Sequence, residues 1–250
     1  MADVTVSGTT GEAITTATRR DDNSDQEIRL GARGEQIVEN LFNGTAGLAM
    51  EGSYFVAQTA TPGTGIAITA TAQTTFSDTA ALLGINNLDT NPFVSGQGRC
   101  IYLDYVQILV TTVPTSETSD HIAHRLDLGM RNSAGTAITG RPVHGGYGTL
   151  PMGQVLLLPT VAAATANVRN LGRNILRTQI PVAFDQYIIK FGSQENAGGG
   201  VSVGSTAASV ITVFAPQVVI PPGWSYVMNS WGVARAAAMS GEVTVAWYER

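Results

Sequence analysis

Residues 100–113 read CIYLDYVQILVTTV, a run in which only Asp104 and Gln107 depart from apolar or β-favouring residue types. A run that is apolar on both faces is typical of a central strand covered on two sides. The next run, HIAHRLDLGM at 121–130, alternates apolar and polar residues. This period of two predicts a strand with one apolar and one polar face. The middle of the chain is therefore predicted to be β-structure.

Similar runs extend in both directions from this centre. Further strands are predicted at 54–58, 66–71, 154–158, 176–182, 186–191, 208–214, 224–231 and 242–248. Turn signals separate them, including TPG at 61–63, GG at 145–146, GGG at 198–200 and PPG at 221–223. No helical pattern alternates with these runs, which argues against parallel βαβ units. We therefore predict an all-β fold for residues 46–250, an antiparallel two-sheet sandwich of the jelly-roll type.

The first 45 residues differ in amino-acid composition from the rest of the chain. Residues 1–33 are rich in Thr, Gly, Ala, Asp and Arg, with few bulky apolar side chains to form a core. Ile37, Val38, Leu41 and Phe42 have the spacing of one helical face, which predicts a short helix over 34–42 that ends at Asn43-Gly44. We expect residues 1–45 to be an extended arm, held by a neighbouring chain. Four arginines are candidates for salt bridges to a partner, and exposure of these charges to solvent is an equal alternative: Arg19, Arg20, Arg29 and Arg33.

Composition excludes several classes of protein. The chain has 250 residues, of which 44% are hydrophobic and 13% are charged, so it can bury a core and is not disordered throughout. Its net charge of −5 provides no basic field for nucleic acid. Cys100 is the only cysteine, so no disulfide forms within the chain. The N-terminus lacks the apolar core of a signal peptide, and no run approaches 18 apolar residues, so neither secretion by that route nor a membrane span is expected.

The sequence contains no arrangement typical of catalysis. His121 and His124 are three residues apart on a predicted strand, so they project to opposite faces and cannot hold one metal ion together. The histidine pair of a metal-binding cupin, the nucleophile motif G-x-S-x-G and a phosphate-binding loop are all missing. His124 is expected to be a core residue with satisfied hydrogen bonds, and His144 a loop residue. We predict a protein that is not an enzyme and has no metal or cofactor.

The segments PQVVIPPGWSYVMNSW, residues 216–231, and GEVTVAWYER, residues 241–250, carry a family resemblance. They resemble the closing strands of jelly-roll structural proteins in tailed-bacteriophage particles, where an Ile-Pro-Pro-Gly type turn precedes an aromatic-rich strand. The resemblance covers about 35 residues. The long spine helix of the major capsid protein of tailed phages has no counterpart in this sequence. The resemblance therefore implies an accessory shell protein.

Three functions are compatible with these patterns and are stated as expectations. The first is a capsid decoration or cement protein: a homo-oligomer, with a trimer favoured, made in the host cytoplasm and bound to the major capsid protein on the outside of the virion. The second is a tail-associated receptor-binding protein with a carbohydrate surface on the loops at 145–147 and 198–200. A sugar-stacking platform could also form from the aromatic side chains, most of which core packing explains more simply: Trp224, Trp231, Trp247, Tyr102, Tyr105, Tyr226 and Tyr248. The third is a cupin-like or hydrolytic enzyme, which a bound metal or a carboxylate pair in a cleft would favour.

Overall fold

The computed structural model of the chain describes residues 14–18, 25–30, 36–37, 44–59, 61–69, 73–91, 98–114, 116, 119–192 and 207–250. The chain divides into two compact units, Met1–Gly47 and Leu48–Arg250. In the first unit, β1 (Ile14–Thr18), β2 (Asp25–Leu30) and β3 (Gln36–Ile37) form a small antiparallel sheet. The expectation that residues 1–45 form an arm on another chain stays a prediction.

The helix predicted over 34–42 is wrong at the two of its positions that the structure describes. Gln36 and Ile37 form strand β3, whose partners in β2 are Leu30 and Arg29. The remaining positions of that prediction, 34–35 and 38–42, lie outside the described residues. A short apolar run is compatible with either type of structure, and here a neighbouring strand supplies the backbone partners. The helix α1 follows instead, at Gly44–Met50.

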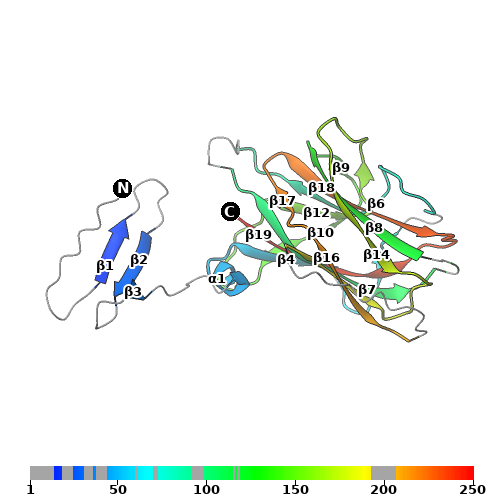
Figure 1. Ribbon diagram of the computed structural model, residues 1–250, viewed down its shortest axis with the longest axis horizontal. Coiled ribbons are helices and arrows are strands. Elements are labelled where there is room, and N and C mark those ends of the chain that lie inside the picture. Colours follow the sequence, from blue (N-terminus) through cyan, green and yellow to red (C-terminus); the bar gives the residue numbers. More distant parts are fainter. Residues whose placement is uncertain are drawn as a thin grey trace. The chain divides into compact units, whose positions relative to one another are not determined.

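The second unit is a sandwich of two large sheets (Figure 1). The six-stranded sheet contains, in spatial order, β10 (Thr136–Ile138), β12 (Gly153–Leu157), β6 (Ala81–Asn87), β18 (Trp224–Val233), β8 (Ser119–Leu128) and β14 (Arg169–Arg177). The eight-stranded sheet contains β11 (Gly140–Pro142), β4 (Tyr54–Gln58), β19 (Ser240–Glu249), β7 (Ile101–Thr112), β15 (Gln186–Phe191) and β16 (Val210–Ala215), with β17 (Val219–Ile220) on β7 and β5 (Ile66–Ala67) on β19. A short pair, β9 (Asn132–Ser133) and β13 (Thr160–Val161), forms a separate sheet that packs on the six-stranded sheet.

The order of the strands is that of a jelly roll. Eight of the strands pair as in one folded ribbon, first with last, second with seventh, third with sixth and fourth with fifth: β4, β6, β7, β8, β14, β15, β18 and β19. The ribbon is then rolled up, because β19 also pairs with β7 and β18 with β8. These pairs are all antiparallel, and β16 joins the edge of β15 in the parallel sense. The prediction of an all-β two-sheet sandwich is thus confirmed.

The inner faces of the two sheets form one core around Trp247. Trp247 is fully buried, stacks on Phe55 and donates its indole hydrogen to Glu249 Oε1 at 3.0 Å. Gly140 and Gly153 leave the space for the indole: a Cβ atom would lie 2.6 Å from the ring at the first position and 3.0 Å from it at the second. The last strand is thereby fixed between the first strand of the roll and β7.

Most predicted strands are confirmed, with four corrections. The strand predicted at 66–71 ends at Ala67, because residues 68–69 are not in a strand, and residues 70–71 lie outside the described part of the chain. β7 is central, but its outer face is only half-buried, because Tyr102 and Tyr105 lie on a surface that α1 covers at one corner. The strand predicted at 176–182 is wrong beyond Arg177, since β14 runs from Arg169 and has polar residues that suit an exposed edge. Residues 81–87 form β6, a buried strand that was not predicted because Gly84 and two asparagines lower its apparent β-propensity.

We expect the substitution Gly140→Ala to lower the free energy of unfolding by about 1–3 kcal/mol, because the new methyl group overlaps the indole of Trp247. Gly145→Ala is the matched control. A Cβ atom there meets nothing within 4 Å, and its effect should stay within about 0.5 kcal/mol. Chemical denaturation of both variants measures the difference. Equal stabilities would contradict the packing described for Trp247.

Candidate functional site

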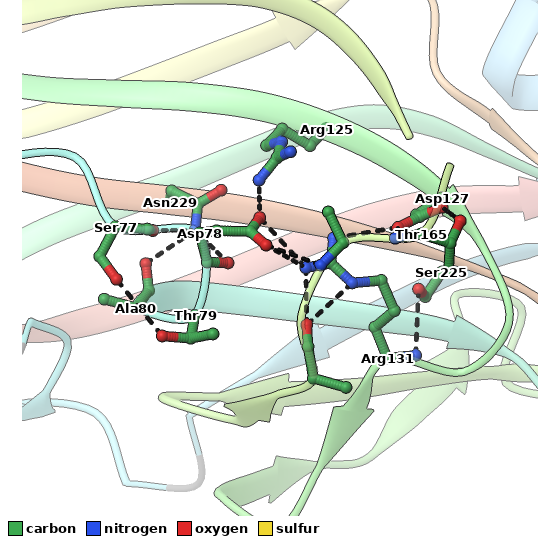
Figure 2. Close-up of polar contacts among 12 residues, drawn as sticks. Ser77, Asp78, Thr79, Ala80, Arg125, Asp127, Arg131, Thr165, Ser225 and Asn229 are labelled. Carbon is green, nitrogen blue, oxygen red and sulfur yellow. Dashed lines mark hydrogen bonds and ion pairs between the residues drawn. The ribbon is translucent and has the colours of Figure 1, made fainter. Parts of the chain in front are cut away.

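Buried charged side chains gather on the outer face of the six-stranded sheet (Figure 2). Asp78, in the loop before β6, accepts two hydrogen bonds of 3.1 Å from Arg131 Nη2 and pairs with Arg125 of β8. It also accepts a 2.7 Å hydrogen bond from the backbone N–H of Ala164, in the loop before β14. One carboxylate therefore joins two loops to the strand beneath them.

A second carboxylate completes this cluster, which we call the loop clasp: Asp78, Arg125, Asp127, Arg131 and Thr165. Asp127 is fully buried, lies 3.3 Å from Arg131 Nη1, and accepts hydrogen bonds from the N–H and hydroxyl of Thr165. Burial alone would raise the pKa of Asp127. The hydrogen bonds from Thr165 and Leu128 and the charge of Arg131 outweigh burial, so the pKa lies below its ordinary value. With two aspartates and two arginines the clasp is balanced in charge.

Residues 121–128 form a strand with apolar side chains on one face and mostly polar side chains on the other, as predicted. The polar face, however, is not exposed to solvent. His121, Arg125 and Asp127 are all buried there, beneath the two loops. The strand itself ends at Leu128 rather than Met130. Sequence reasoning missed the clasp, although Arg125 and Asp127 two residues apart on one strand face were a signal for it.

Two more ion pairs are fully buried in the same unit. Arg235 Nη2 lies 2.8 Å from Asp120 Oδ1, and Arg177 pairs with Asp185. Asp185 also accepts hydrogen bonds from the backbone N–H groups of Val182 and Ser209, at 2.7 and 2.9 Å. These aspartates fix connections between strands, and each has an arginine partner in its own chain.

His124 is the core histidine that was expected. Its Nδ1 lies 2.6 Å from the Tyr226 hydroxyl and its Nε2 lies 2.9 Å from Asn174 Oδ1. Because Asn174 donates its amide to Phe214 O, its Oδ1 is the acceptor, so Nε2 carries the imidazole hydrogen and Nδ1 accepts from Tyr226. Burial lowers the pKa of His124 to about 4, with the hydrogen bond to Asn174 opposing the shift. The ring is neutral at pH 7.

An open groove of about 400 Å³ lies beside the clasp on the same sheet face. Its lining includes Phe76, Ala123, Asn170, Arg173 and Trp231. Phe76 is 47% exposed and meets Trp231 edge-on, with ring centroids 5.5 Å apart. Trp231 in turn stacks on His121. The groove combines an exposed aromatic ring with a guanidinium group.

Seven large apolar side chains are exposed at one end of the sandwich, where β4, β7, β12 and β18 begin. We call this set the apolar end; its members are 41–73% exposed: Met50, Leu88, Leu128, Met130, Val143, Tyr147 and Leu150. Backbone hydrogen bonds connect the segments, from Val143 N to Tyr54 O, Leu88 N to Met152 O and Gly129 N to Gly223 O. The residues thus belong to one end of the fold.

Arg29 alone of the four candidate arm residues lies in the described part of the chain. Arg29 lies in β2, where its backbone is opposite Ile14 and Ile37. Arg19, Arg20 and Arg33 lie outside the described residues, as does the loop at 198–200. His144 and the loop at 145–147 are exposed at the apolar end, as a loop position requires. The role of the four arginines stays a prediction.

Comparisons with protein-family models and with characterised proteins find no match to this sequence. Within the described residues, no group of three or more His, Cys, Asp and Glu side chains is placed to hold a metal ion. The same part of the chain contains no helix that is long and apolar enough to cross a membrane. The features that bear on function are therefore the clasp, the groove and the apolar end.

We expect Asp78→Ala to lower the free energy of unfolding by about 2 kcal/mol, because two arginines then lose a carboxylate that is only 30% exposed. Limited proteolysis should cut the loops at 73–80 and 162–168 sooner in this variant. The matched control is Glu51→Ala, which removes an exposed ion pair with Arg250 and should cost less than about 0.5 kcal/mol. Loops as resistant as in the wild type would contradict the clasp.

The neutral His124 predicts a loss of stability in mild acid. Its folded pKa is about 4 and its ordinary value is 6.5, so the unfolded chain binds the proton first as the pH falls. The stability difference between wild type and His124→Gln should therefore shrink by roughly 3 kcal/mol between pH 7 and pH 4, at about 1.4 kcal/mol per pKa unit. Urea denaturation at each pH measures it.

His121→Gln should show a change of the same sign, because burial and the charges of Arg173 and Arg235 also lower the pKa of His121. If the stability difference between wild type and His124→Gln stays constant with pH, the conclusion that His124 is neutral in the folded chain is refuted.

Proposed function

We propose that this chain is a structural protein of a virus particle: a decoration or cement protein that binds the outside of a tailed-phage head as a trimer. The observation that carries the proposal is the apolar end, where seven large apolar side chains are exposed on segments at one end of the sandwich. Large apolar side chains that are exposed together on one side of a protein often mark an interface with another protein. The partners proposed for this surface are the other copies in the trimer and the major capsid protein.

The rest of the unit supports an assembly role. Jelly rolls occur in capsid proteins, lectins and cupins, so the fold is compatible with a structural, a sugar-binding or an enzymatic role and does not choose among these three. The clasp and the two core ion pairs hold loops in fixed positions by contacts within the chain. Fixed loops lose little conformational entropy when they bind, which favours a rigid protein that must occupy many equivalent sites on a shell. The resemblance of residues 216–231 and 241–250 to phage jelly-roll proteins points to the same class.

Self-assembly is tested by placing charge on the apolar end. We expect light scattering to give the mass of a trimer for the wild type, and a monomer for the double variant Met130→Glu, Leu150→Glu, because buried unpaired carboxylates are unfavourable at an interface. Val210→Glu is the matched control: Val210 is 66% exposed but lies at the other end of the sandwich, so this variant should remain a trimer. Thermal unfolding should separate lost assembly from lost folding. A wild-type monomer at all concentrations would contradict the trimer.

Location on the particle is tested by electron microscopy of the phage that carries this gene. Gold-labelled antibodies against the chain should bind intact heads. Label on the tails alone would support the receptor-binding alternative instead, and particles without label would overturn a virion role.

A further inference from the structure

We propose that the groove beside the loop clasp binds a carboxylated sugar. This inference goes beyond the structural role and does not depend on it, because the groove residues are distinct from those of the apolar end. The shape of the groove, its charge and its polar and aromatic lining each restrict the class of ligand that fits.

The hollow lies where the small residue Ala123 is next to an irregular edge strand. Ala123 of β8 and Gly172 of β14 lie along the groove, and the register of β14 shifts between Asn170 and Gly172. Bulges of this kind re-aim the side chains next to them, and they are common beside binding sites. The groove thus lies along the edge strand of the six-stranded sheet.

The charge of the groove is positive. The guanidinium of Arg125 is already neutralised by Asp78, whereas Arg173 is exposed and has no carboxylate partner among the described residues. Its charge reaches the neighbouring ring, since Arg173 is one of the causes that lower the pKa of His121. An exposed arginine at the wall of a groove is suited to bind a carboxylate through two parallel hydrogen bonds.

The polar and aromatic groups beside Arg173 favour a sugar. Asn170 Oδ1 accepts a 3.0 Å hydrogen bond from Arg125 Nε, which fixes the amide and leaves its two N–H donors for a hydroxyl group. Arg125 also lies over the ring of Phe76, 5.5 Å from its centroid, and holds this half-exposed ring at the groove. An aromatic ring offers an apolar surface to the C–H face of a pyranose. An aromatic ring, an oriented amide and a guanidinium together match one acidic monosaccharide or disaccharide.

The size of the groove and the net charge of the chain argue against larger acidic ligands. A volume of about 400 Å³ is within the range of small-molecule sites. Nucleic acid would present many phosphates to a chain whose net charge is −5, and such a polymer is repelled overall. The proposed ligand is therefore a terminal uronic or sialic acid residue, such as those that end surface glycans.

The test is titration of the full chain with N-acetylneuraminic acid and with glucuronic acid, followed by saturation-transfer NMR, with galactose and glucose as neutral probes. We expect the two acids to bind and both neutral sugars to bind at least tenfold more weakly, because a charge-assisted pair is lost. Arg173→Gln should weaken acid binding about tenfold or more, and Phe76→Ala should abolish saturation transfer to the ring protons of the sugar. Arg169→Gln is the matched control, because Arg169 is exposed on the same strand but lies over Trp224, outside the groove.

Unfolding measurements on each variant separate loss of the site from loss of the fold. No binding of either acid, or equal binding by Arg173→Gln, would overturn the proposal. If N-acetyl-aspartate binds as tightly as the two acidic sugars, the groove recognises an acidic peptide rather than a sugar, and the proposal is overturned as well. None of these outcomes bears on the assembly of the chain at its apolar end, so the two proposals can fail separately.

Discussion

The structure of the second unit depends on one constraint: β19, near the end of the chain, must insert between β4 and β7. This insertion closes the eight-stranded sheet and places Trp247 at the centre of the core, in the space left by two glycines. The pairing of β4 with β19 joins segments almost 200 residues apart in the sequence. The entropy cost of closing this long loop is offset only when the whole roll has formed its contacts. Ribbon pairing, core and loop positions all follow from that closure.

Charge is used inside this fold to position loops. A second layer of polar side chains covers the six-stranded sheet, where Asp78 accepts hydrogen bonds from Arg131 and from the backbone N–H of Ala164. Although burial alone would raise the pKa of Asp127, its hydrogen bonds and the charge of Arg131 keep that pKa below its ordinary value. Ion pairs of this kind seldom add net stability over apolar packing, but they specify one arrangement. The clasp thus fixes the wall of the groove, since Arg125 contacts Asp78, Asn170 and the ring of Phe76.

Sequence patterns predicted the sandwich because most of its strands have apolar residues at strand spacing, as at 54–58 and 186–191, where the predicted bounds match the structure. They failed where tertiary pairing outweighs local preference. β6 contains Gly84 because Asn132 occupies the place of a side chain, and β14 has a polar edge sequence. Arg125 and Asp127 on one strand face were a signal for the clasp, but its loop partners and the groove could not be predicted, since Asp78, Arg131 and Arg173 are distant in sequence and reach β8 only through the folded loops and the edge strand.

The central claim is that the chain binds a shell through its apolar end. Hydrogen exchange, compared between the free chain and the chain on intact phage heads, tests this claim most directly. We expect added protection at 88–91, 128–131 and 143–151, with little change at 73–80 or 162–168. Protection confined to those two loops, or no difference between the free and bound chain, would contradict the claim.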